Sequence, residues 1–227
     1  VSPKNRALTS QKKIGLNGLL IHDYPTGLSR YSFELMHRIL TQWEGESVAY
    51  STSPELNKEF PRSTKSSVPP FHYPANFRSN SVRLSWEQIG LRYACYRDKL
   101  DLIFSPIAEG IVFPQLPQII TVLDLLPFHY PNLLPRWVPY YEYFLPTLIN
   151  GSTAVVCISE FTRQEVLERY PKIQEEKLKV IHGGVDLERF QPCSPGVIKE
   201  RYELKDYLLC VGEVRPYKNI ENVFRAM

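Results

Sequence analysis

The sequence predicts an α/β protein built on a mostly parallel sheet with helices on both faces. Short, uninterrupted apolar runs alternate along the chain with segments in which apolar residues recur every three or four positions. Uninterrupted apolar runs are typical of strands that are covered on both sides, as in a parallel sheet. Strands that alternate with helices build βαβ units, whose right-handed connections place helices on the faces of the sheet.

The expected strands are short and are spread over the whole chain. The clearest apolar runs are residues 14–20, 47–51, 102–104, 119–123, 154–158 and 178–181. A polar stretch with several prolines, residues 54–81, separates the second run from the third. We expect this stretch to be mostly loop, with a short strand near Val68.

The expected helices are identified by apolar periodicity and capping residues. The turn at Thr26–Gly27 leads into a helix whose apolar face is Leu28, Tyr31, Leu35 and Ile39. Ser159 is a good N-cap for a helix at 160–170. A stripe of Trp86, Ile89, Tyr93 and Tyr96 indicates a helix at 85–97. A second stripe is expected to pack in the core, the alternative being a membrane-surface or partner face: Trp137, Tyr141, Phe144, Leu145 and Leu148.

The composition excludes several classes of protein. With 43% hydrophobic and 22% charged residues, the chain has the composition of an ordinary globular protein, and no apolar run is long enough to cross a membrane. A net charge of +3 without a basic block gives no indication of a nucleic-acid partner. The four cysteines and five histidines show no metal-ligand spacing, so we expect no metal site and a reducing, cytoplasmic location.

The end of the chain, 207–227, has the pattern of a strand, a glycine turn and a helix. Residues 207–211 are apolar, Gly212 turns the chain, and Arg215 and Lys218 precede a helical stripe. A strand, turn and helix with added cations is how α/β proteins hold phosphate. One such unit has no neighbours to bury its faces, so we expect the sequence to be cut just after a second domain begins.

Chemically loaded residues follow several of the expected strands. Ligands collect at the carboxyl ends of parallel strands. Gly27 lets the backbone come close to a ligand at a helix start, Glu109 follows the run 102–104, and Asp124 ends the run 119–123. A turn, an ordinary loop and a solvated strand end are the respective alternatives, and the residues alone leave them open.

Five segments in order carry a resemblance to a known family. The stretches CISEFTRQEVLERY, EEKLKVIHGGVDLERFQP and YLLCVGEVRPYKNI resemble the domain junction of family 4 retaining glycosyltransferases, which have the GT-B fold. TGLSRYSFEL resembles the glycine loop and first helix of that family, and TVLDLLPFHYP resembles its strand that ends in a His-Asp pair. Each match is short, and together they span residues 13–227.

The resemblance implies a division of the chain into domains. Residues 1–12 would be a leader that is disordered or derived from expression. Residues 13–190 would be a Rossmann-like, acceptor-binding domain, the N-terminal half of a GT-B fold. Residues 191–206 would be the hinge, and residues 207–227 the truncated start of a nucleotide-sugar-binding domain.

The resemblance also implies roles for individual residues. Gly27, Arg215 and Lys218 would contact the donor diphosphate, where the two cations stabilise charge on the leaving nucleotide without a metal or other cofactor. Asp124 would be catalytic, near the acceptor and the transferred sugar. Arg30 and Glu109 would bind the acceptor. Leu123 departs from the family, which often has a histidine there, and so removes one expected sugar-binding group.

The function implied is transfer of a sugar, with retention of configuration, from a nucleotide-diphosphate donor to a glycan, lipid or small acceptor. Without the later glutamate pair of the family, this chain alone is expected to be inactive. The alternatives are a GT-B-fold nucleotide-sugar epimerase and a non-catalytic binding or interaction module. Net positive charge and the second aromatic stripe allow peripheral contact with the inner membrane face, and no nucleic-acid partner is expected.

Overall fold

A computed structural model of the protein describes residues 12–21, 26–51, 53–60, 66–67, 80–192, 196–205, 207–212 and 214–227. The chain divides into two compact units, Val1–Gly183 and Gly184–Met227. The ends predicted from sequence for the first domain and the hinge, residues 190 and 206, both lie within the second unit.

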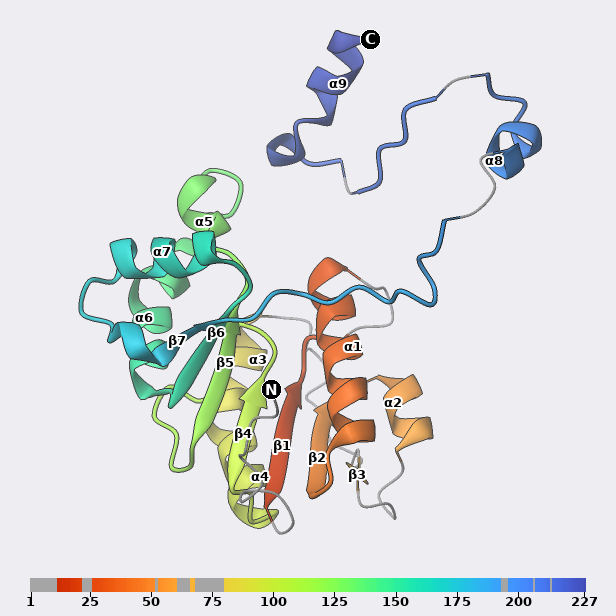
Figure 1. The fold of residues 1–227 in the computed structure, drawn as a ribbon. Helices are drawn as coiled ribbons and strands as arrows, with labels where there is room; N and C mark the ends of the chain where they lie inside the picture. Colours follow the sequence, from red (N-terminus) through yellow and green to blue (C-terminus); the bar gives the residue numbers. More distant parts are fainter. Residues whose placement is uncertain are drawn as a thin grey trace, which may run out of the picture. The chain divides into compact units, whose positions relative to one another are not determined.

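Within the described part of the first unit, seven strands form one sheet in which every neighbouring pair is parallel (Figure 1). They are β1 (Lys13–Gly18), β2 (Glu46–Ser51), β3 (Ser66–Ser67), β4 (Leu102–Ser105), β5 (Gln118–Val122), β6 (Ala154–Cys157) and β7 (Leu178–Val180). The order along the sheet is β3-β2-β1-β4-β5-β6-β7. The predicted fold class is therefore confirmed. Val68 itself lies outside the described residues.

Helices cover both faces of this sheet, also as predicted. Helices α1 (Gly27–Gln42) and α2 (Pro54–Glu59) pack on Ile14 and Leu16 of β1. The opposite face carries α3 (Asn80–Trp86), the π-helical turn η1 (Glu87–Leu91), α4 (Arg92–Arg97), α6 (Leu145–Gly151) and α7 (Glu160–Arg169). Figure 1 shows α1 and α2 on one side of β1 and β2, and α3 and α4 on the other.

The strand register explains why α6 and α7 share a face with α3 and α4. Ile103 pairs with Gln118, so Ile103 and Ile120 project from the same face of the sheet. Ile103 packs in a cluster with residues of η1 and α4, and Ile120 packs in a cluster with residues of α6 and α7. All connections from β4 onward therefore run over one face, and those from β1 to β3 over the other.

The predicted first helix is confirmed, but its buried face differs from the predicted one. The most buried positions of α1 are Ser29, Ser32, Met36 and Leu40, whereas Leu28 is 43% exposed. Two of these four positions are serines, whose small side chains let the helix lie close to the sheet. Because an apolar pattern does not mark serine as buried, the predicted face is displaced by one residue.

The helix predicted at 85–97 is present, but three residues of its apolar stripe are exposed to solvent instead of packing in the core. Ile89, Tyr93 and Tyr96 are between 64% and 80% exposed. The buried side of this helical segment consists of Arg83, Glu87, Leu91, Ala94 and Cys95. Arg83 and Glu87 thus occupy buried positions, although the apolar periodicity predicts that they are exposed to solvent.

The prediction of loop at 54–81 is wrong for its first six residues. Helix α2 begins there because Ser53 accepts a hydrogen bond from the backbone N–H of Leu56 and Pro54 occupies the first helical position. Ser159 caps α7 in the same way through the N–H of Thr162, at 3.1 Å, as predicted.

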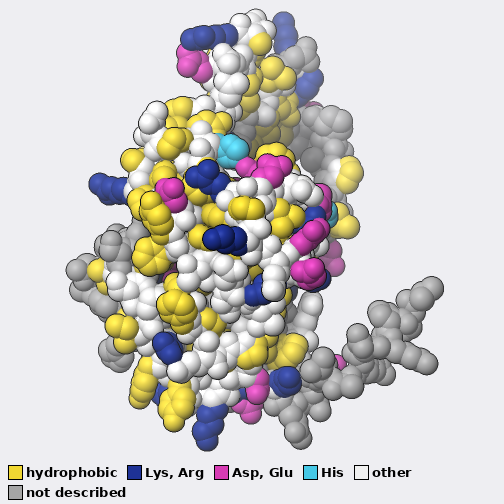
Figure 2. All heavy atoms as spheres, turned by 90° about the vertical axis from the view of Figure 1, so that its left-hand side faces the viewer, with side chains coloured by type: hydrophobic (Ala, Val, Ile, Leu, Met, Phe, Trp, Pro, Cys, Tyr) yellow, Lys and Arg dark blue, Asp and Glu magenta, His cyan; other side chains and the backbone are white. Residues whose placement is uncertain are grey.

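The second aromatic stripe is mainly a core feature. Leu145 and Leu148 are fully buried, and Tyr141 packs against the same cluster, while Phe144 remains 55% exposed. Figure 2 views the side of the molecule that carries α5 (Leu126–His129), α6 and α7, where hydrophobic side chains are interspersed with charged ones. No helix among the described residues is long and apolar enough to cross a membrane.

The second unit contains helices α8 (Gly196–Arg201) and α9 (Ile220–Ala226) and the 3₁₀ turn η4 (Pro216–Lys218). The strand predicted at 207–211 is not formed. Leu208, Leu209 and Val211 are between 68% and 87% exposed. A parallel strand needs a neighbour for its backbone groups, and none of the described residues of this unit supplies one.

Candidate functional site

The strand order changes direction between β1 and β4, which makes this the topological switch point of the sheet. In open α/β sheets, ligands bind in the crevice outside the carboxyl ends of the strands at this point. Asn17 lies next to the end of β1, and Ser105 is the last residue of β4. Both are buried, so the switch point is built on polar groups rather than on a purely apolar core.

A continuous hydrogen-bond network joins the two strand ends to the helical segment behind them. The Asn17 side-chain amide donates to Oε1 of Glu87 at 3.0 Å and to Oγ of Ser105 at 3.1 Å. The Asn17 side-chain oxygen accepts from the backbone N–H of Leu19 at 3.4 Å, which fixes the start of the β1–α1 connection. Glu87 is the first residue of the π-helical turn η1, a kind of turn that often occurs at functional sites.

Glu109 is bound within the protein by a two-pronged ion pair. Arg83 donates from Nε to Oε2 at 2.9 Å and from Nη2 to Oε1 at 2.6 Å, and both side chains are about 95% buried or more. This fork geometry is the strongest form of carboxylate recognition that arginine offers. The acceptor-binding role of Glu109 stays a prediction, but both of its carboxylate oxygens are already bonded to Arg83.

The first part of the loop after β4 is buried and bonded by side chains. Every residue from 105 to 111 is buried. Tyr140 donates from its hydroxyl to the carbonyl of Ala108 at 2.8 Å, and Gln88 donates to the carbonyl of Gly110 at 2.8 Å. Gln118 bonds both the N–H and the carbonyl of Ile111, each at 2.9 Å. A buried loop whose backbone is satisfied by side chains presents a fixed surface at the switch point.

Burial governs the ionisation of the acids in this network. Burial, followed by the negative charge of Glu109, raises the pKa of Glu87 well above its usual range, while Asn17 and Arg83 act in the opposite direction. Burial also raises the pKa of Glu109, against the opposing effect of Arg83. The pKa of Tyr140 is raised by burial and then by Glu109 and Glu87.

Gly27 is the first residue of α1, as predicted, and its surroundings are open. Thr26 caps the helix by accepting from the N–H of Ser29 at 3.3 Å. A Cβ atom built on Gly27 would meet no atom within 4 Å in the described structure. The fold therefore does not require glycine here, which leaves room for a ligand as its reason. Arg30 pairs with Glu34 one turn later on the exposed side of the helix.

Asp124 lies two residues after the end of β5, at the carboxyl edge of the sheet. Its Oδ1 accepts from the backbone N–H of Leu126, the first residue of α5, at 3.0 Å. The residue is exposed, and its negative charge contributes to raising the pKa of Tyr141, behind the larger effect of burial. One carboxylate oxygen thus has a local structural role, while the side chain remains accessible to a ligand.

His129 ends α5 and bonds through Nε2 to Oε1 of Glu165 on α7. The guanidinium carbon of Arg169 lies over the ring of the neighbouring Phe128, 4.0 Å from the ring centre. These two contacts tie α5, and with it the segment that begins at Asp124, to α7. Leu123, where a histidine was expected, uses its backbone carbonyl to accept from Thr162 at 3.2 Å.

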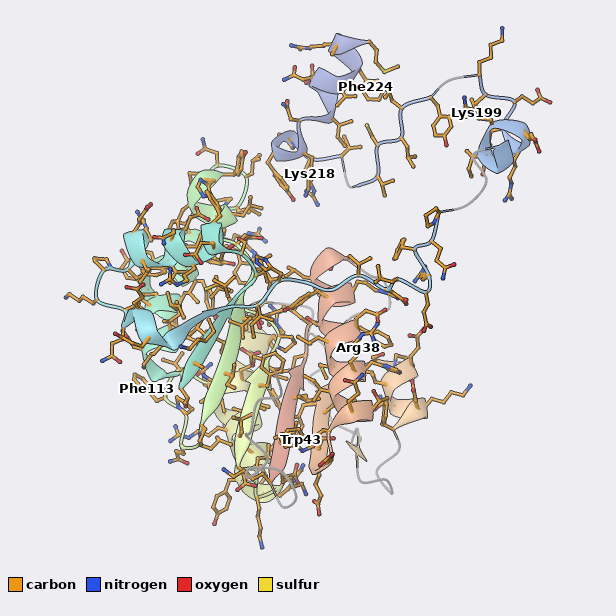
Figure 3. The ribbon with its side chains drawn as sticks, in the orientation of Figure 1. Arg38, Trp43, Phe113, Lys199, Lys218 and Phe224 are labelled. Carbon is orange, nitrogen blue, oxygen red and sulfur yellow. The ribbon has the colours of Figure 1, made fainter. Side chains whose placement is uncertain are left out.

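Arg215 and Lys218 lie in the second unit, where Arg215 precedes the turn η4 and Lys218 is its last residue, shortly before α9. Lys218 is labelled in Figure 3. Both residues are exposed, and the Lys218 ammonium lies 5.6 Å from the centre of the Tyr217 ring. Their expected position next to the donor diphosphate stays a prediction.

Gly27, Glu109 and Asp124 follow strands at the carboxyl edge of the sheet, where the sequence predicted them, and their roles in a site stay predictions. The sequence did not indicate three of the buried polar side chains at this edge. Asn17, Arg83 and Glu87 were missed because each looks like an ordinary polar residue within a strand or helix. The described residues include no group of three or more His, Cys, Asp or Glu side chains placed to hold a metal ion.

Comparison with known proteins gives consistent results. The family model described as Glycosyltransferase Family 4 matches residues 25–189. The O-antigen chain mannosyltransferase RfbU of Salmonella typhimurium (strain LT2) is 28% identical over 108 residues, which is 48% of this chain and 28% of that protein. A glycosyltransferase structure from Rickettsia africae ESF-5 is 17% identical with a TM-score of 0.50, covering 88% of this chain and 51% of that one.

The apo form of the lipopolysaccharide outer core galactosyltransferase WaaB is also similar, with 9% identity and a TM-score of 0.47. That match covers 78% of this chain and 47% of the other. The chain thus spans about half the length of the solved structures that it resembles, and the Rickettsia match shows that it shares their fold.

Proposed function

Because the chain belongs to glycosyltransferase family 4, we propose that it forms the acceptor-side domain of a retaining glycosyltransferase of the hexosyltransferase class. The observation that carries this proposal is the family match over residues 25–189, most of the first unit. The donor would be a nucleotide-diphosphate sugar, bound between this domain and a second one. A glycan carried on a lipid is the acceptor class that we favour, because the similar mannosyltransferase is named for O-antigen chains.

In this proposal, the residues of the chain position substrates and stabilise charge. The open backbone at Gly27 would accept the donor diphosphate against the first turn of α1, where N–H groups and the helix dipole favour an anion. Arg215 and Lys218 would add positive charge as the nucleotide leaves. Asp124 would contact the acceptor or the transferred sugar with the carboxylate oxygen that is not bonded to the N–H of Leu126. We further propose a cytoplasmic location, with peripheral contact at the inner membrane face.

The 227-residue chain on its own is expected to have no transferase activity. Catalysis in this proposal needs two domains to close on the donor, and the chain spans about half the length of its structural relatives. The measurement is release of nucleoside diphosphate from a panel of UDP-, GDP- and ADP-sugars, with lipid-linked glycans as acceptors. Normal turnover by the chain alone would show that the proposed division of labour between domains is wrong.

Replacing Gly27 by alanine is expected to leave the fold intact and to damage sugar transfer. A methyl group at this position meets no atom of the described residues within 4 Å, so the urea midpoint should stay close to that of the wild type. The same methyl group would displace the donor, and a misplacement of about 1 Å costs on the order of 10²-fold in rate. Transfer is measured with the whole glycosyltransferase that contains the chain.

The matched control is Gly183→Ala, because a Cβ atom at this position also meets no atom of the described residues within 4 Å. This variant should keep wild-type rates. If Gly27→Ala transferred sugar as fast as Gly183→Ala, the open surface at the start of α1 would not be the place where the donor approaches the backbone.

A further inference from the structure

We propose that Glu87 is a positioning residue, present as the uncharged acid, that acts with Asn17, Arg83 and Glu109 to fix the two connections at the switch point. These connections are the start of the β1–α1 segment and the buried loop at 105–111. The importance of this unit for sugar transfer rests on the proposed function. Its existence rests only on the contacts and burial of the four side chains.

The first argument is charge balance. The buried network contains two carboxyl groups and one guanidinium group, and Arg83 places both of its prongs on Glu109. Glu87 is completely buried and has a side-chain amide, rather than a cation, as its bonded partner. Burying an ionised carboxylate without a counter-charge is far more costly than burying a neutral acid. The pair Arg83–Glu109 is neutral as it stands, so the uncharged form of Glu87 keeps the whole site neutral.

The second argument is the environment of the second Glu87 oxygen. Within the part of the chain that the structure describes, Oε2 of Glu87 makes no hydrogen bond of normal geometry. The backbone N–H of Gly110 acts on the Glu87 carboxyl group and lowers its pKa, but burial raises that pKa by more. The charged form would leave half of a delocalised negative charge at this weakly satisfied atom. The neutral acid places only an unpaired hydroxyl there, a smaller penalty.

The titratable and charged groups that face Glu87 come from three different elements, and Arg83 alone among them opposes the uncharged form. Glu109 comes from the loop after β4, Arg83 from α3, and Tyr140 from the π-helical turn η2 (Tyr140–Phe144). Asn17 from β1 faces Glu87 as a neutral donor. Burial and the charge of Glu109 together raise the pKa of Glu87, and Arg83 does not outweigh them because it is committed to Glu109.

The positioning role follows from what each group holds. Oε1 of Glu87 orients the Asn17 amide, and the other end of that amide holds the N–H of Leu19 and hence the start of the β1–α1 connection. Arg83, one turn before Glu87 on the same helical segment, holds Glu109 and hence the loop at 105–111. One helical segment therefore sets the spacing of the two connections at the switch point.

Glu87→Gln and Glu109→Gln in the 227-residue chain form a matched pair that tests the proposal by urea unfolding. Glutamine at position 87 keeps the acceptor for Asn17 and needs no proton uptake on folding, so its midpoint at pH 7 should equal or exceed the wild-type value. Glutamine at position 109 leaves Arg83 buried without a counter-charge and should lower the midpoint by about 1 M or more. Equal losses in the two variants, or a larger loss in Glu87→Gln, would overturn the uncharged assignment.

The pH dependence gives an independent result. A carboxyl group whose folded pKa is raised stabilises the fold fully below its unfolded pKa, about 4.3, and this contribution is lost as the pH rises through the folded pKa. The stability of the wild type relative to Glu87→Gln should therefore fall as the pH rises above about 5. A difference that stays constant, or that rises with pH, would contradict the proposal.

Hydrogen exchange tests the positioning role separately from stability. Glu87→Leu removes the acceptor for Asn17 and should speed exchange in peptides covering 15–21 and 103–113, with α7 unchanged. Glu87→Gln should restore protection in both peptides. Unchanged exchange in Glu87→Leu would show that Glu87 holds neither connection. None of these measurements involves a sugar, so their failure is distinct from a failure of the proposed transferase function.

Discussion

Replacing Arg83 by methionine is expected to lower the free energy of unfolding of the first unit by about 3–5 kcal/mol at pH 8. Methionine fills much of the space of the arginine stem, so the loss comes mainly from the charge. Without the guanidinium group, Glu109 is left buried with no cation bonded to it, next to Glu87. Urea unfolding of the 227-residue chain, followed by far-UV circular dichroism, measures the change.

The loss should be smaller at pH 5 than at pH 8. Removing Arg83 removes the group that lowers the pKa of Glu109 against the effect of burial. Both carboxyl groups then have raised folded pKa values, so the stability present below the unfolded pKa of about 4.3 is lost as the pH rises. Acidic solution therefore returns part of the stability, because both acids can bind protons and become neutral in the folded state.

The control for this prediction is Arg30→Met, which breaks an exposed pair with Glu34 at the spacing i, i+4. Such exposed pairs contribute about 0.3–0.5 kcal/mol. If Arg83→Met lost no more stability than Arg30→Met at pH 8, the buried pair would not be a principal support of the switch point.

The strands and the overall fold could be predicted because their signal is local. Each strand from β4 to β7 lies in a short, mostly apolar run of sequence, because helices bury one face of these strands and the other face is partly buried. The caps at Ser53 and Ser159 likewise depend on residues within one turn. Ser159 was predicted from its type and position, whereas Ser53 was not, because prolines nearby indicated a loop.

The buried network could not be predicted because its partners lie far apart in the sequence. Glu109 is 26 residues from Arg83, and Asn17 is 70 residues from Glu87. A periodicity rule places charged residues on the exposed side of a helix, and it therefore chose Ile89, Tyr93 and Tyr96 as the inner face. The rule fails where tertiary contacts neutralise a charge inside the protein, which is also where functional sites tend to form.

The prediction for residues 207–211 failed for the opposite reason. The run has the composition of a buried strand, yet composition gives only the tendency to be covered and not the presence of a partner. Leu209 and Val211 are more than three-quarters exposed. An apolar run that correctly predicts a strand in the sheet of the first unit therefore forms no strand here, where no neighbouring strand is described.

Replacing Asp124 by asparagine in the whole glycosyltransferase is expected to lower kcat/KM for sugar transfer by about 100-fold or more, the usual range for a catalytic acid or base. Asparagine keeps an oxygen that can accept from the N–H of Leu126, so this hydrogen bond to the start of α5 should be retained. The substitution removes only the negative charge at the carboxyl edge of β5. A large loss of rate with an unchanged urea midpoint would therefore separate a catalytic role from a structural one.

Two further variants define the meaning of that result. Asp124→Ala also removes the hydrogen bond to the N–H of Leu126 and should lose about 1 kcal/mol of stability in addition to activity. Asp186→Asn is the matched control, because Oδ1 of Asp186 likewise accepts from backbone N–H groups, those of Glu188 and Arg189 at 3.1 Å. Near wild-type rates are expected for Asp186→Asn. Equal rates for Asp124→Asn and Asp186→Asn would mean that Asp124 only bonds the start of α5, and that the charge needed near the sugar comes from another part of the enzyme.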